Sequence, residues 1–169
     1  MEPNMHIFKD GPELAEKLAG DVAAHLKAAI EERGAASMAV SGGSTPKLFF
    51  QTLSKHQLEW PRISITLVDE RFVPPDNDRS NHKLVAENLL QNEAKAAYFV
   101  PLYQSAASPE DAATLATART ADICDPFDIV ILGMGTDGHT ASFFPGGDNL
   151  EEALDFDEPR TVLTMAAEN

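Results

Sequence analysis

Residues 127–142 read FDIVILGMGTDGHTAS, an apolar run that leads directly into a loop with three glycines. The apolar run predicts a buried strand. The glycines allow the loop to turn tightly and to approach its surroundings closely. In open α/β folds, ligands bind at the carboxyl ends of the strands. The stretch therefore predicts a strand of an α/β sheet that ends in a functional loop.

This loop contains Asp137 and His139, two residues apart. A histidine can take up a proton near neutral pH, and a nearby carboxylate can orient it, so the pair predicts a general base and its partner. The loop also matches the dinucleotide pattern Gly133-x-Gly135-x-x-Gly138. We reject that interpretation because Asp137 would place a negative charge against the pyrophosphate. A glycine-rich turn with a hydrogen-bonded histidine remains the structural alternative.

Apolar periodicities elsewhere predict an alternation of strands and helices. Strands are expected at 36–40, 63–68, 98–100, 127–132 and 161–165, and helices over 14–30 and from Thr45, Ser80 and Ser108, with Thr45 as a helix cap. Such an alternation is typical of a mainly parallel sheet with helices on both faces. The length of 169 residues predicts a single domain over 1–169.

A second loop follows the strand at 36–40 and reads Ser41-Gly42-Gly43-Ser44-Thr45. Its glycines allow a tight turn, its hydroxyls can donate hydrogen bonds, and a helix start carries a partial positive charge. These features predict a phosphate cradle. A plain strand-to-helix turn is the alternative.

A third loop begins with Asp69-Glu70-Arg71 at the end of the strand at 63–68. Two carboxylates and a guanidinium at a strand end can combine a proton acceptor with an anchor for an anion. A surface cluster of salt bridges is the alternative.

The composition is that of an ordinary soluble protein, with 43% hydrophobic and 24% charged residues. A net charge of -14 argues against nucleic acid or an anionic membrane as the main partner. The single cysteine suits a reducing compartment, and the N-terminus has no signal-peptide pattern. We therefore expect a cytoplasmic protein. We also expect no metal site, because no histidines have the spacing of metal ligands.

Taken together, four motifs resemble those of the 6-phosphogluconolactonase family. They are SGGSTP at 41–46, DERFVP at 69–74, SN at 80–81 and GMGTDGHTASFFPG at 133–146. The resemblance spans nearly the whole chain in the order of the family. It implies a Rossmann-like α/β fold and hydrolysis of 6-phospho-D-glucono-1,5-lactone to 6-phosphogluconate, a step of the oxidative pentose phosphate pathway, without cofactor or metal.

The resemblance also implies roles for individual residues. His139 would activate a water molecule, and Asp137 would orient His139. Asp69 would position sugar hydroxyls. The substrate and its phosphate would be held by Ser41, Gly42, Gly43, Ser44, Thr45, Glu70, Arg71 and Gly135. Family members continue past this point with a further strand, a terminal helix and cationic phosphate contacts, so we expect a chain that lacks its C-terminal segment.

Two other functions remain in view. Glucosamine-6-phosphate deaminases are similar at Asp137-Gly138-His139 but carry Asn-Glu-Pro where this chain has Phe143-Phe144-Pro145. Loss of that glutamate argues against ring opening and deamination. A non-catalytic sugar-phosphate sensor is the second alternative. The presence of His139 and Asp137, and the lack of a basic DNA-binding segment, argue against it.

Overall fold

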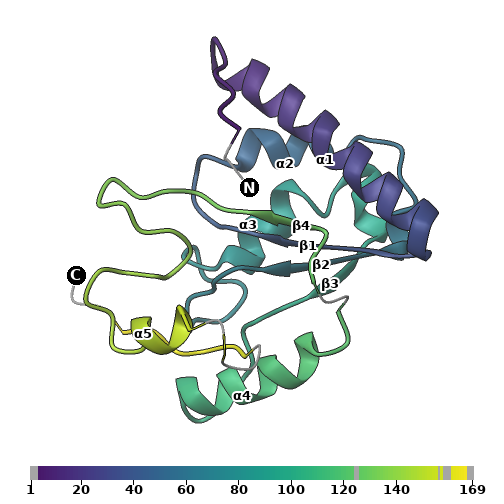
Figure 1. Ribbon diagram of the computed structural model, residues 1–169. Helices are drawn as coiled ribbons and strands as arrows, with labels where there is room; N and C mark the ends of the chain where they lie inside the picture. The colour runs from purple at the N-terminus through teal and green to yellow at the C-terminus, as the bar shows by residue number, and fades with distance from the viewer. Residues whose placement is uncertain (1–3, 124–125, 156, 158–160, 167–169) are drawn as a thin grey trace.

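The computed structural model describes residues 4–123, 126–155, 157 and 161–166. Figure 1 shows the strands in the middle of the molecule with helices above and below them. The elements are, in order, α1 (Gly11–Arg33), β1 (Ala36–Val40), α2 (Lys47–Leu53), the 3-10 helix η1 (Trp60–Arg62), β2 (Ile63–Leu67), α3 (Asn81–Asn88), the 3-10 helix η2 (Asn92–Ala96), β3 (Tyr98–Val100), α4 (Pro109–Thr120), β4 (Ile129–Ile131) and α5 (Leu150–Ala153). None of the helices in the described ranges is long and apolar enough to cross a bilayer.

The four strands form one parallel sheet in the order β3-β2-β1-β4. This confirms the predicted parallel α/β fold. β1 lies between β2 and β4, with Val40 opposite Leu67 on one side and Ile131 on the other. Because parallel strands point the same way, the loops after β1, β2 and β4 leave the sheet at the same edge.

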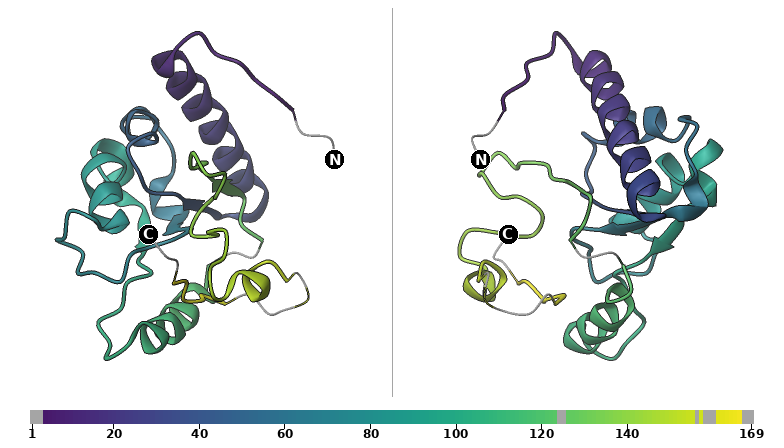
Figure 2. Two further views of the ribbon diagram at one scale, coloured as in Figure 1. Left: turned by 90° about the vertical axis from the view of Figure 1, so that its left-hand side faces the viewer. Right: turned by 45° about the vertical axis from the view of Figure 1, so that its right-hand side comes forward.

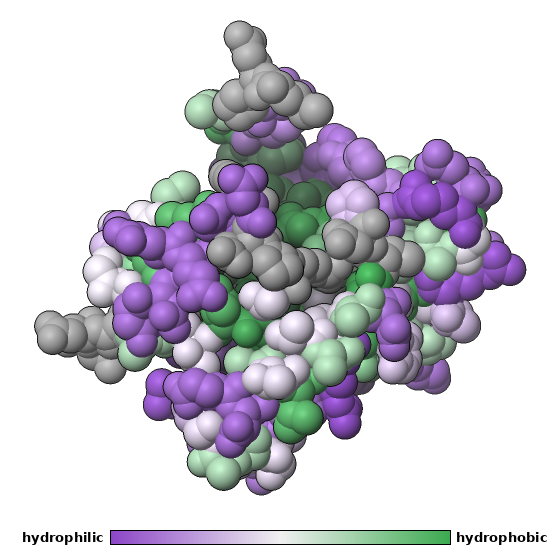
Figure 3. All heavy atoms as spheres, turned by 60° about the horizontal axis from the view of Figure 1, so that its bottom comes forward, coloured by the Kyte–Doolittle hydropathy of each residue, from purple (hydrophilic) through white to green (hydrophobic). Residues whose placement is uncertain are grey.

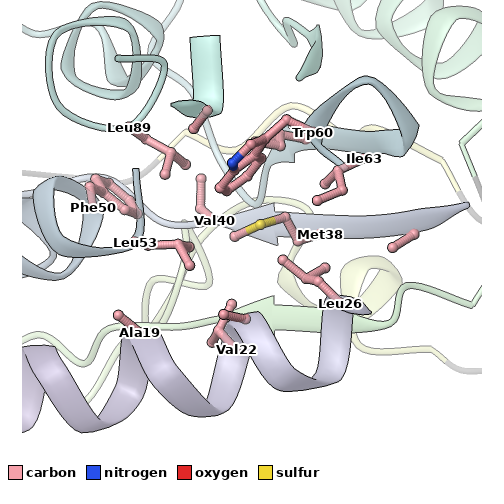
Figure 4. Close-up of a cluster of buried hydrophobic side chains, with 14 of the residues drawn as sticks. Ala19, Val22, Leu26, Met38, Val40, Phe50, Leu53, Trp60, Ile63 and Leu89 are labelled. Carbon is pink, nitrogen blue, oxygen red and sulfur yellow. The ribbon is translucent and has the colours of Figure 1, made fainter. Parts of the chain in front are cut away.

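One face of the sheet is closed by α1, α2 and α3. Val22 and Leu26 of α1 point toward Met38 of β1, and Phe50 of α2 packs into the same cluster (Figure 4). Leu26, Met38 and Phe50 are fully buried, as is Trp60. Burying an aliphatic side chain of this size contributes about 1.5–3 kcal/mol. This cluster therefore supplies the main apolar driving force for the fold.

The helix starts follow from their capping residues, with one exception. Helices begin after Ser80 and Ser108, as predicted. Ser80 accepts a hydrogen bond from Lys83 N, and Ser108 accepts one from Asp111 N. The prediction of Thr45 as a cap is wrong. The cap position of α2 is Pro46, in helical backbone geometry and without a side-chain cap. The fixed φ of proline already directs the chain into the helix, and the carbonyl of Pro46 accepts the first helical bond from Phe50 N at 2.9 Å.

The opposite face of the sheet is covered less tightly. Figure 2 shows α4 on the side of the sheet away from α1, which confirms helices on both faces. Ala39 and Val130 face α4 and residues 161–166 across a pocket of about 600 Å³. Val130 remains 48% exposed. Seen from this side in Figure 3, apolar surface lies between hydrophilic residues.

The prediction of a strand at 161–165 is wrong, because the described residues 161–166 form no strand. Most of their hydrogen-bonded backbone groups pair with side chains instead. Val162 N donates to Thr117 Oγ1 at 2.9 Å, Asn149 Nδ2 donates to Thr164 O at 3.0 Å, and Ala166 N donates to Asp148 Oδ1 at 2.8 Å. With these partners, the β-favouring composition of the segment does not lead to strand pairing.

Candidate active site

Backbone hydrogen bonds bring the three predicted loops together at one sheet edge. Val68 N donates to Val40 O at 3.0 Å, and Ser41 N donates to Ile131 O at 3.1 Å. These two bonds extend the strand pairing to the first residues of the loops. The sheet order, with β1 in the centre, therefore makes the loops that begin at Ser41 and at 69 and 133 immediate neighbours.

His139 and Asp137 form a direct pair, with Nδ1 of His139 2.6 Å from Oδ1 of Asp137. This hydrogen bond holds the pKa of Asp137 below its usual value. An ionised carboxylate only accepts hydrogen bonds, so Nδ1 of His139 carries the proton and donates it. In a neutral imidazole with its proton on Nδ1, the other ring nitrogen, Nε2, carries a lone pair that can accept a proton. The structure thus brings the predicted pair into direct contact. Its role as a base and its partner stays a prediction.

Gly135 leaves the space in which this pair lies. A Cβ atom at Gly135 would lie 2.4 Å from Nδ1 of His139 and 2.6 Å from Oδ1 of Asp137. The backbone closes the turn underneath, because Gly135 N donates to His139 O at 2.8 Å. Gly135, predicted as a substrate-binding residue, therefore lies against the side chains of the pair.

Phe144 packs on the imidazole from the same loop. Its ring centroid is 4.5 Å from that of His139, at an interplanar angle of 45°. The two rings limit each other's rotation. The sequence motif included Phe144 but predicted no such contact, because ring packing depends on how the loop turns back at residues 140–144.

Asp69 is buried at the end of β2, and Oδ2 of its carboxylate accepts a hydrogen bond from Ser142 Oγ at 2.9 Å. Burial raises the pKa of Asp69, while the bond from Ser142 and the nearby Arg71 guanidinium act in the opposite direction. His139 also lowers this pKa when its imidazole is protonated. Asp69 thus belongs to the same electrostatic site as His139.

Asn81 is a site residue whose role sequence reasoning missed. Its Nδ2 donates to the backbone carbonyl of Asp69 at 2.9 Å. Its Oδ1 lies where a Cβ atom at Gly42 would be, at 1.8 Å. Asn81 thus ties the loop after β2 to the loop after β1. The available signal was the SN motif at 80–81, to which sequence reasoning assigned no contact. The structure buries Asn81 at the first position of α3.

Glu70 has a structural task that the sequence did not indicate. Its Oε1 accepts hydrogen bonds from Arg71 N and Asn81 N, both at 2.8 Å. Its Oε2 accepts from His82 N at 2.8 Å and from Ser80 Oγ at 3.2 Å. The carboxylate therefore caps the start of α3, where a negative charge is favourable. Contact of Glu70 with substrate stays a prediction.

The loop after β1 presents backbone donors. Across the described residues, the N–H groups of Gly43, Ser44 and Thr45 make no hydrogen bond, and all three residues are exposed. Gly43 has a φ of 90°, a left-handed conformation that suits glycine. Arg71 is exposed at the end of β2. Free backbone N–H groups and an exposed guanidinium are groups that can bind an anion. The phosphate cradle stays a prediction.

Asp69, Arg71 and Ser142 also line the pocket below the sheet, whereas Asp137 and His139 are not among its lining residues. Within the described part of the chain, His, Cys, Asp and Glu side chains form no group of three that could hold a metal ion.

Comparison with known proteins identifies the family. The sequence model of the family described as glucosamine-6-phosphate isomerases/6-phosphogluconolactonase matches residues 9–168 of this chain. A 6-phosphogluconolactonase of Rhizobium meliloti is 64% identical, and the match covers 99% of this chain and 72% of the relative. A 6-phosphogluconolactonase of Pseudomonas aeruginosa is 44% identical, with 96% and 68% covered. The crystal structure of a 6-phosphogluconolactonase from Shewanella baltica gives a TM-score of 0.87 at 45% identity, with 89% of this chain and 64% of that structure covered.

These comparisons confirm the resemblance that the four motifs indicated, and the solved structure has the same α/β fold. The chain therefore belongs to the glucosamine-6-phosphate isomerase/6-phosphogluconolactonase family.

Proposed function

We propose that this protein hydrolyses 6-phospho-D-glucono-1,5-lactone to 6-phosphogluconate. The observation that carries the proposal is the His139–Asp137 pair at 2.6 Å, at the sheet edge where three loops meet. The relatives that match most of this chain bear the name 6-phosphogluconolactonase. A lactone is an internal ester, and a base that activates water accelerates its hydrolysis.

In the proposed reaction, Nε2 of His139 takes a proton from water while the water oxygen bonds to the lactone carbonyl carbon. Asp137, already hydrogen-bonded to Nδ1, stabilises the imidazolium that forms. The bond between the carbonyl carbon and the ring oxygen then breaks. The imidazolium returns its proton to that oxygen, which becomes a hydroxyl of the open-chain acid. The cycle restores neutral His139.

The phosphate of the substrate would be held by the N–H groups of Gly43, Ser44 and Thr45, together with Arg71. A local arrangement of donors is needed because the chain carries a net charge of -14, which repels an anion overall. Asp69 would position sugar hydroxyls by accepting hydrogen bonds from them. Its distance from bulk water strengthens such bonds.

Deamination of glucosamine 6-phosphate is disfavoured by Phe144. In the deaminases this loop carries a glutamate, whereas here an apolar ring packs on His139 at 4.5 Å. A carboxylate that could assist ring opening is thus replaced by a side chain with no proton to exchange.

The test is lactone hydrolysis with the spontaneous rate subtracted, run beside an ammonia-release assay with glucosamine 6-phosphate. Hydrolysis above the spontaneous rate without ammonia release supports the proposal. Ammonia release, or hydrolysis no faster than the spontaneous rate, would overturn it.

A variant sharpens the assignment of the phosphate site. Arg71→Ala should raise KM for the phosphorylated lactone by roughly ten- to a hundredfold, because a charge-assisted hydrogen bond is lost. KM for unphosphorylated gluconolactone should change little. Equal changes for both substrates would show that Arg71 does not contact the phosphate.

A further inference from the structure

Ser142 connects the two loops that carry the proposed catalytic groups. It lies three residues after His139, and its hydroxyl donates to Oδ2 of Asp69 at 2.9 Å, although the two residues are 73 positions apart in the chain. Ser142 is half-buried and Asp69 is buried, so water competes little for this bond.

The bond is specific to the carboxylate. Asn81 also contacts Asp69, but it donates to the backbone carbonyl. Among the residues that the structure describes, Ser142 alone donates a hydrogen bond to the carboxylate of Asp69, and it uses one of the two oxygens. The other oxygen, Oδ1, can accept a hydrogen bond from a ligand.

We propose that Ser142 is a positioning residue for lactone hydrolysis. By holding Oδ2 of Asp69, its hydroxyl directs Oδ1 toward the substrate and keeps the His139 loop against the end of β2. The base and the hydroxyl-binding carboxylate then act on the same substrate molecule. This inference rests on the function proposed above.

The surroundings of Asp69 give the proposal a signature in the pH dependence. Burial raises the pKa of Asp69, and the bond from Ser142 opposes that rise. The charged and titratable groups facing this carboxylate are Arg71, Glu70 and His139, of which Glu70 alone raises its pKa. Removal of the Ser142 hydroxyl should therefore raise the pKa of Asp69 further, because one bond to the charged form is lost.

Three variants separate this role from a general structural one. Ser142→Ala removes the hydroxyl, and Ser142→Thr retains one. Thr140→Val is the matched control, because Thr140 Oγ1 in the same loop donates to the backbone carbonyl of Gly133 at 2.8 Å and not to Asp69. For each variant, kcat/KM is measured against pH, and the Asp69 carboxyl is titrated by 13C NMR.

In Ser142→Ala, kcat/KM should fall about tenfold, and its acid limb and the NMR midpoint of Asp69 should both move up by about one pH unit. Ser142→Thr should restore most of kcat/KM and most of the wild-type position of the acid limb and of the Asp69 midpoint. Thr140→Val should keep the wild-type acid limb and the wild-type Asp69 midpoint.

The inference is overturned if the Asp69 midpoint in Ser142→Ala equals the wild-type midpoint, or if Thr140→Val shifts it equally. It is also overturned if the midpoint moves while kcat/KM and its acid limb do not, since the bond would then have no part in positioning. The NMR titration does not depend on turnover. If the wild-type protein fails to hydrolyse the lactone, the proposed function fails, and the titration still shows whether Ser142 acts on Asp69.

Discussion

The face of the sheet that packs on α1 and the carboxyl edge of β1 and β2 differ in the kind of side chain that they bury. On the α1 side, Leu26, Met38 and Ile65 are fully buried and carry no charge. At the carboxyl edge of the same strands, Asp69 is 9% exposed, and burial raises its pKa. Burying apolar atoms stabilises a protein, whereas burying a carboxylate costs free energy unless it is paired. The apolar side thus stabilises the sheet, and the edge uses part of that stability to hold reactive groups in place.

The largest effect is expected for the base. His139→Ala should lower kcat by roughly 10²–10⁴, which is the usual contribution of a positioned general base. The thermal midpoint should stay near that of the wild type, because His139 lies outside the apolar cluster. Lactone hydrolysis, corrected for the uncatalysed rate, measures the first quantity, and thermal unfolding measures the second. Turnover at the wild-type rate would remove His139 from the mechanism.

In the core we expect the opposite result, a loss of stability with little change in activity. Leu26→Ala should lower the free energy of unfolding by about 2–5 kcal/mol, because Leu26 is fully buried between α1 and the sheet. In the fraction that remains folded, kcat should be close to wild type. Denaturant unfolding gives the first value and a titrated assay the second. A small stability loss would mean that the cavity collapses around the missing atoms.

A glycine pair tests the geometry of the site directly. Gly135→Ala should lower kcat by about 10²-fold, because its Cβ atom would displace the His139 ring by contact at 2.4 Å. Gly133→Ala is the matched control, since its Cβ atom would meet only Ser41 Oγ, at an ordinary 3.8 Å. Equal losses in the two variants would show that loop flexibility, not the space beside His139, determines activity.

The smallest effect concerns stability at the edge. The pKa of Asp69 is raised on folding, so between its ordinary value and the raised value the folded protein keeps a proton that the unfolded chain has released. Stability therefore falls as pH rises through that window. Asp69→Asn has no such loss, so its thermal midpoint at pH 7 should exceed that of the wild type.

At pH values below the ordinary pKa of an aspartate, the thermal midpoints of Asp69→Asn and the wild type should converge, because Asp69 is then neutral in both the folded and the unfolded wild-type protein. Thermal unfolding at several pH values measures this. An Asp69→Asn midpoint that is lower than wild type at pH 7 would mean that the ionised carboxylate stabilises the fold through its partners.

Several features could be predicted from the sequence because they depend on neighbouring residues. They include the apolar periodicity of α1, the helix starts at Ser80 and Ser108 and the β-rich run of β2, which all act within a few positions along the chain. The Asp137–His139 pair spans three residues, so its proximity follows from the loop itself.

Local rules failed where distant partners decide the conformation. Residues 161–166 have the composition of a strand, yet Thr117, Asp148 and Asn149 take up their backbone groups. Local spacing also gave no sign that Glu70 accepts hydrogen bonds from the backbone N–H groups at the start of α3.

The sequence alone determined that strands end in three polar, glycine-containing loops, and that one loop carries a histidine beside a carboxylate. Only the tertiary structure decided that Ser142 meets Asp69, that Asn81 joins Asp69 to Gly42, and that Phe144 covers His139. The physical reason is that strand order and side-chain packing set which distant atoms meet. Spacing along the chain determines only which atoms of neighbouring residues can meet.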